Sequence, residues 1–324
     1  MPSKRRRDVI DDSVVGAYHV YDRCTRQDFL LGLDPVRGRD FGYRKEMFLK
    51  RLEMLQSVFA VECLDDAVLD NHFHMILRNR PDLVLEWSDQ EVAERWLRLN
   101  RRELDLRPSP TPDQIAGLVA DTKRLKKIRQ RLASVSWLMG YLREPLARAF
   151  NTEDGVRGFF WGRFGCEPLK NETSLLACSL YVAMNPVRAG IATSVETSRH
   201  TSVEARLVDR QSGDPARPKS GWLAAVHVDG DGFQGASDRR RPSDKGYLGL
   251  TFDEYLDLLD QMIQRERAEK RGEYDHAAPS ILERLGISPT AWEATVRLTS
   301  RRFTRELDEM AKIRAAASGR TSGR

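Results

Sequence analysis

The sequence predicts an α+β protein built on an antiparallel sheet, because its first elements follow the order of a split β-α-β unit. Residues 14–24 are rich in valine and tyrosine and predict a strand. Residues 43–61 repeat apolar side chains about every 3.6 positions and predict an amphipathic helix. Residues 59–81 hold two short apolar runs around the turn-prone pair Asp70 and Asn71, which predicts a β-hairpin. The order strand, helix, strand, strand is half of the split β-α-β plan.

The pattern downstream of this hairpin is mainly helical. Helices are expected at 89–103, 112–133, 136–150, 172–186, 251–271 and 278–312. The segment RPSPTP (107–112) interrupts the series. Thr173 or Ser174 is expected to cap the helix at 172–186, and Pro186 to end it. The short aromatic segment 158–169 predicts a further strand or an irregular hairpin.

These elements divide the chain into three predicted parts. The main domain is expected at 1–208, with a helical insertion at about 84–135. Residues 209–246 are rich in Gly, Pro, Ser and Asp and predict a linker or long loop. A helical C-terminal extension is expected at 247–324.

Composition limits the class of protein. No apolar run approaches the roughly 20 residues that span a bilayer, and no apolar segment follows the basic N-terminal residues. The four cysteines are widely spaced and form no CxxC pair, which argues against a zinc ribbon or a disulfide framework. We therefore expect a cytoplasmic protein. The net charge of +5 permits nucleic-acid binding without requiring it.

Basic residues cluster in KRLKKIRQR (123–131), which contains no acidic residue. Lys123, Arg124, Lys126 and Lys127 are candidate phosphate contacts within it. A run of this kind is more often a solvated helix face, and the sequence leaves both readings open.

Two histidines flank one phenylalanine in DNHFHMIL (70–77). Side chains two residues apart on a strand share a face, so His72 and His74 project together. Neutral imidazoles in this arrangement can bind one divalent cation, and two polar residues on a half-buried strand are the alternative. The residues that follow are apolar, so the metallo-hydrolase pattern, in which an acid comes soon after the pair, is not met.

Tyr181 and Asn185 lie four residues apart on one predicted helix and point the same way. Taken singly, the tyrosine suggests packing and the asparagine before Pro186 suggests a helix stop. Together with His72 and His74 they suggest a phenolic nucleophile beside an amide oxygen that completes a metal site.

Four segments in this order resemble the single-tyrosine HUH transposases, specifically the repeat-associated tyrosine transposases related to the smallest bacterial insertion elements. They are YHVYDRC (18–24), DNHFHMIL (70–77), WLMGYLREPLARAFNTEDGVRGFFWGRF (137–164) and ACSLYVAMNPVRAGI (177–191). The resemblance covers roughly residues 14–205, and residues 199–207 and 255–292 are similar to a subgroup with a helical C-terminal extension.

The resemblance implies a ferredoxin-like catalytic fold that cleaves and rejoins single-stranded, hairpin-forming DNA. His72 and His74 would bind Mg²⁺ or Mn²⁺ with Asn185 as third ligand. Tyr181 would form a 5′-phosphotyrosine and release a 3′-hydroxyl. Arg157, Trp161, Arg163 and Arg188 would contact DNA, although Trp161 is equally compatible with core packing.

Two alternatives remain open on sequence grounds. The chain could be a domesticated DNA-binding regulator that keeps the fold without transposition, or a metal-dependent hydrolase of small phosphoesters. The sequence also leaves undecided whether the protein is a monomer or a homodimer.

Overall fold

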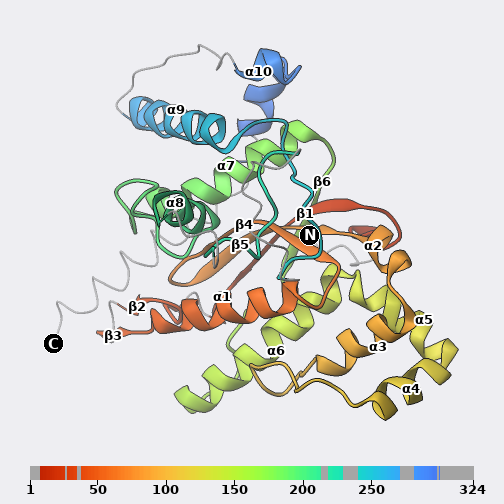
Figure 1. Ribbon diagram of the computed structural model, residues 1–324. Helices are drawn as coiled ribbons and strands as arrows, with labels where there is room; N and C mark the ends of the chain where they lie inside the picture. The colour runs from red at the N-terminus through yellow and green to blue at the C-terminus, as the bar shows by residue number, and fades with distance from the viewer. Residues whose placement is uncertain are drawn as a thin grey trace.

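A computed structural model of the protein describes residues 8–25, 28–34, 38–212, 218–228, 240–270, 281–297 and 299. The structure confirms the predicted α+β class. One four-stranded antiparallel sheet runs through the molecule, and helices cover both of its faces (Figure 1).

The sheet has the strand order β4-β5-β1-β6. Its strands are β1 (Gly16–Arg23), β4 (Val61–Val68), β5 (His72–Asn79) and β6 (Gly165–Leu169). Every neighbouring pair is antiparallel, so β1 and β4 run in the same direction with β5 between them. This is the split β-α-β arrangement that the order of the N-terminal elements predicts. A separate two-stranded ribbon pairs β2 (Leu33–Asp34) with β3 (Arg39–Asp40).

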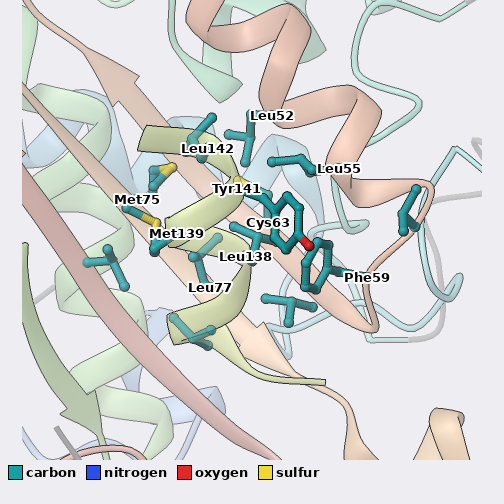
Figure 2. Packing of buried hydrophobic residues seen from close by; sticks show 14 of the residues in the cluster. Leu52, Leu55, Phe59, Cys63, Met75, Leu77, Leu138, Met139, Tyr141 and Leu142 are labelled. Carbon is teal, nitrogen blue, oxygen red and sulfur yellow. The ribbon is translucent and has the colours of Figure 1, made fainter. Parts of the chain in front are cut away.

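Helices α1 (Tyr43–Gln56) and α6 (Val135–Asp154) lie together on one face of the sheet, and α7 (Glu172–Arg188) lies on the other (Figure 1). Side chains along β5 alternate between the two faces of the sheet, so this strand contributes residues to both. Phe73, Met75 and Leu77 enter the cluster shared with α1 and α6. Figure 2 shows Met75 and Leu77 beside residues of these two helices. The histidines alternate with them and therefore face α7.

The predicted helical insertion contains α2 (Pro81–Glu86), α3 (Asp89–Arg98), α4 (Pro112–Ala120) and α5 (Thr122–Leu132). The single helix predicted at 112–133 is wrong, because the chain breaks at Asp121. This residue leaves helical geometry at φ −90° and ψ 79°, and its side chain accepts a hydrogen bond from the Arg124 amide. A side chain that can bond the backbone in this way favours a helix N-terminus over a helix interior.

The tyrosine helix α7 also differs from its predicted ends. Asn171 caps it by accepting from the Ser174 amide at 2.8 Å, so neither Thr173 nor Ser174 is the N-cap. Pro186 lies inside the helix, which continues to Arg188. Proline removes one donor, but the next turn is still closed by the Ala189 amide, which donates to the Asn185 carbonyl at 2.9 Å.

The C-terminal part adds α8 (Ser202–Ser212), α9 (Phe252–Lys270) and α10 (Ile281–Arg284), and residues 289–297 are also helical. The part of the predicted helix 278–312 beyond residue 299 lies outside the described residues. Within the predicted linker, Leu223 and Val226 are buried, and the Ala224 amide donates to the Cys63 carbonyl on β4 at 2.9 Å.

Candidate active site

Three of the predicted site residues meet between the sheet and α7. His72 and His74 project from β5, and their ring centroids lie 5.1 Å apart at 86°. The ring of Tyr181 on α7 is perpendicular to that of His74, with 5.5 Å between the centroids. The alternation of side chains along β5 directs both histidines to one face of the sheet, and α7 covers that face. Residues more than a hundred positions apart in the sequence therefore come together.

Two further residues of β1 join this group. His19 Nε2 lies 3.0 Å from His74 Nδ1, and Tyr21, the register partner of His74, has its ring centroid 6.0 Å from that of His74. Sequence reasoning placed both in a strand but gave neither a role. The alternation of side chains along β1 could have identified both residues. It places His19 and Tyr21 on one face, and the pairing of β1 with β5 brings that face beside His74.

Burial decides the charge of His74, which is 1% exposed. Loss of hydration lowers its pKa well below the usual histidine value, and the neighbouring His72 and His19 lower it further. The imidazole of His74 is therefore neutral at physiological pH, the form that binds metal ions. His72 Nδ1 lies 2.7 Å from Asn71 Oδ1. Since this oxygen only accepts, Nδ1 carries the proton and the lone pair of His72 is on Nε2.

Asn185 lies one helical turn beyond Tyr181 on α7 and is fully buried. Its side-chain oxygen and nitrogen have no hydrogen-bond partner among the described residues. A buried amide without partners among the described residues is unusual and leaves its oxygen available to a group that these residues do not supply. An amide oxygen and imidazole nitrogens are donors that suit a divalent cation, so the chemistry of these three side chains fits the predicted metal. Within the described chain, no group of three or more His, Cys, Asp or Glu side chains is arranged to bind a metal.

The C-terminal helix α9 covers the tyrosine. Arg188 stacks over the Tyr181 ring at 5.2 Å and forms an ion pair with Glu266 of α9, with 2.6 Å between Nε and Oε2. Met262 of α9, with Val296 and Thr299, closes the small cavity beside Tyr181. Tyr181 is consequently only 4% exposed.

The other predicted DNA contacts lie in two separate places. Arg157, Trp161 and Arg163 are exposed on the loop before β6. Trp161 is 55% exposed, so the core-packing alternative for this residue is wrong. Arg157 lines a cavity of about 330 Å³ together with Arg39 and other residues that do not include Tyr181.

The second place is the outer surface of α5. Lys123, Arg124, Lys126 and Lys127 are exposed there, while Leu125 and other apolar residues of the helix are buried. Figure 1 shows α5 on the opposite side of the sheet from α7. The structure therefore does not bring these four residues to the tyrosine.

Comparison with known proteins gives little further guidance. No family model matches the chain, and no curated protein matches it. Within the described residues, no helix is long and apolar enough to cross a membrane. Among solved structures, the chain is similar to a REP-associated tyrosine transposase bound to a REP hairpin, with 14% sequence identity and a TM-score of 0.37. That likeness covers 67% of this chain and 90% of the other.

Proposed function

We propose that this protein is a DNA strand-transferase that cleaves and rejoins single-stranded, hairpin-forming DNA through Tyr181. The observation that carries the proposal is the approach of Tyr181 to His74 across the interface of α7 and the sheet, at 5.5 Å between ring centroids. The order of the four sequence segments that resemble repeat-associated tyrosine transposases supports the same assignment.

The chemistry is an exchange of phosphodiester bonds. The Tyr181 oxygen attacks phosphorus and a bond forms between them, while the bond to the 3′ oxygen breaks and a 3′-hydroxyl leaves with a proton. The 5′-phosphate stays on the tyrosine. A 3′-hydroxyl can reverse the step by attacking this linkage, so the bond energy is conserved and no nucleotide cofactor is needed.

His72, His74 and Asn185 are the residues that would hold Mg²⁺ or Mn²⁺. Such a cation supplies charge neutralisation at the phosphoryl oxygens during attack. The two histidines would hold it through neutral ring nitrogens, and Asn185 through its amide oxygen, which no described group engages. Arg188, 5.2 Å from the Tyr181 ring, adds positive charge on the same side.

Access to the site requires movement of the segment that covers it. Tyr181 is 4% exposed beside Met262 of α9, Val296 and Thr299, so a DNA strand reaches it only when these residues shift away. The Arg188–Glu266 ion pair is the charged contact that must open, and a DNA phosphate is a natural replacement for the carboxylate.

The decisive experiment detects the covalent adduct. The full chain is incubated with a labelled 5′-tailed DNA hairpin and Mn²⁺, and the products are separated on a denaturing gel. We expect an adduct with the wild type and none with Tyr181→Phe. Tyr21→Phe is the matched control, because Tyr21 also lies near His74 but on β1. An adduct that persists in Tyr181→Phe and disappears in Tyr21→Phe would contradict the assignment of the nucleophile.

The burial of the site favours one second candidate, a domesticated regulator that binds hairpin DNA without cutting it. The same experiment separates the two. Hairpin binding by the wild type with no adduct, even when the Arg188–Glu266 pair is removed, supports the regulator. Cleavage without an adduct supports a phosphodiester hydrolase in place of both.

A further inference from the structure

His19 is a buried polar neighbour of the metal-binding candidate His74. The two imidazoles meet at 3.0 Å between His19 Nε2 and His74 Nδ1, and their rings stack with centroids 5.1 Å apart at 16°. Each residue is 1% exposed, so solvent does not compete for this bond. His19 belongs to β1, while His74 belongs to β5, and the pairing of the two strands fixes the contact.

A hydrogen bond between two neutral imidazoles needs one donor and one acceptor. If His74 Nδ1 donates, the lone pair of His74 is on Nε2 and this nitrogen can bind a cation. If His19 Nε2 donates, His74 carries its proton on Nε2 and cannot bind a cation there. The direction of this one bond therefore decides whether His74 is a metal ligand.

The register of the sheet indicates what sets that direction. Glu167 of β6 is the direct partner of His19 across the β1–β6 pair. Its neighbour Cys166 packs against the core on the α1 and α6 side, so the alternation of β6 turns Glu167 to the same face as His19. Side chains directly opposed in this way have Cβ atoms roughly 5 Å apart. At that separation the Glu167 carboxylate can reach the His19 ring to form a hydrogen bond. A carboxylate only accepts, so it selects the His19 tautomer with the proton on Nδ1 and the lone pair on Nε2.

We propose that His19 is a positioning residue that accepts a hydrogen bond from His74 Nδ1 and so holds the His74 lone pair on Nε2 for a divalent cation, with Glu167 fixing the tautomer of His19. The arrangement is a relay from carboxylate to imidazole to imidazole. Partners of this kind behind a metal-ligating histidine orient the ring and raise its affinity for the metal. This inference rests on the proposed function only for the identity of the metal ligands.

The first test reads the tautomer directly and needs neither metal nor DNA. Long-range ¹H–¹⁵N spectra of the imidazoles are recorded on the full chain after treatment with EDTA, and the His74 signals are identified by their loss in His74→Gln. We expect His74 to carry its proton on Nδ1. A proton on Nε2 in the wild type overturns the proposal.

The second test measures Mn²⁺ affinity by electron paramagnetic resonance. We expect His19→Leu to weaken Mn²⁺ binding by about 10- to 100-fold, as for other partners of metal-ligating histidines. His19→Gln keeps an oxygen that accepts from His74 and should retain most of the affinity. Thermal unfolding checks that both variants fold, and the tautomer of the wild type does not depend on either.

The outcomes separate this inference from the proposed function. If the wild type binds Mn²⁺ with the expected His19 dependence but forms no DNA adduct, the relay stands and the strand-transferase does not. If an adduct forms while His19→Leu and His19→Gln bind Mn²⁺ as tightly as the wild type, the function stands and the relay is wrong. Equal weakening in both variants, or no Mn²⁺ binding by the wild type, also overturns the relay.

Discussion

At the scale of single residues, two adjacent carboxylates on the edge strand β4 have opposite environments. Asp65 accepts hydrogen bonds from Ser202 at 2.8 Å and from Tyr247 at 2.7 Å, and forms an ion pair with Arg206 at 2.7 Å. Asp66 is equally buried, yet neither of its carboxylate oxygens has a hydrogen-bond partner among the described residues. Asp65 therefore joins β4 to α8, whereas Asp66 is a source of instability when it is charged.

Asp66→Asn should stabilise the protein in a pH-dependent way. Burial, followed by the charge of Asp65, raises the pKa of Asp66 to about 8. Between about pH 4 and pH 8 the unfolded chain loses this proton while the folded protein keeps it, so the stability of the wild type falls as the pH rises. The advantage of Asp66→Asn should grow over that window towards a ceiling of about 5 kcal/mol, and urea unfolding at pH 5 and pH 8 measures it.

The neighbouring position provides the matched control. Asp65→Asn leaves the buried guanidinium of Arg206 without its charged partner and should cost about 3–5 kcal/mol at pH 8. An advantage of Asp66→Asn that is the same at both pH values would show that this carboxyl does not titrate in the window.

Most of the candidate site could be predicted at this scale, but not all of it. His72, His74, Tyr181 and Asn185 share local spacings that place them on common faces of one strand and one helix, and local spacing is visible in a sequence. His19 and Asp65 depend on which strands pair and on which helix covers them. Those partners lie more than 50 residues away, so no local pattern reveals them.

At the scale of elements, the contact between α7 and α9 controls the surroundings of Tyr181. Arg188 of α7 and Glu266 of α9 form their ion pair at 2.6 Å with both side chains mostly buried. Met262 of α9 packs beside the same tyrosine. Among the described residues, the contact thus combines apolar packing with the Arg188–Glu266 ion pair, and the ion pair can be weakened without changing the apolar side chains.

Glu266→Gln should increase hairpin binding and adduct formation, if the proposed function holds. The substitution keeps the shape of the side chain but releases the charge of Arg188 for a DNA phosphate. A partly buried ion pair of this kind contributes about 1 kcal/mol, which corresponds to roughly a fivefold change in affinity. Fluorescence anisotropy with a labelled hairpin at low salt measures the change.

Asp260→Asn is the control for this prediction. It removes the same charge from α9, but Asp260 is an exposed residue that accepts from Gln264 and has no contact with Arg188 recorded among the described residues. Equal gains in the two variants would show that net charge, and not the link to Arg188, governs binding.

At the scale of the whole molecule, the fold follows from hydrophobic repeats that the sequence displays and from tertiary contacts that it does not. Period-two and period-3.6 repeats predicted the β4–β5 hairpin, α1 and α7, because each repeat is local. The break at Asp121 and the continuation of α7 past Pro186 depended on single hydrogen bonds that the repeats do not encode. The position of α9 over α7 is a tertiary contact, and it determines whether the site is open.

The candidate metal site spans two layers of the molecule, so a bound cation should stabilise the whole fold. His72 and His74 come from the sheet and Asn185 from α7, and the unfolded chain does not hold the three together. A cation at 100 times its dissociation constant then adds about 2.7 kcal/mol to the free energy of unfolding. We expect Mn²⁺ to raise the melting temperature by a few degrees in scanning calorimetry and EDTA to reverse the rise.

His74→Ala should abolish the rise, whereas His227→Gln should keep it, because His227 lines a different cavity, with Arg206 and Asp253. A rise of equal size in His74→Ala would place the bound cation elsewhere on the protein.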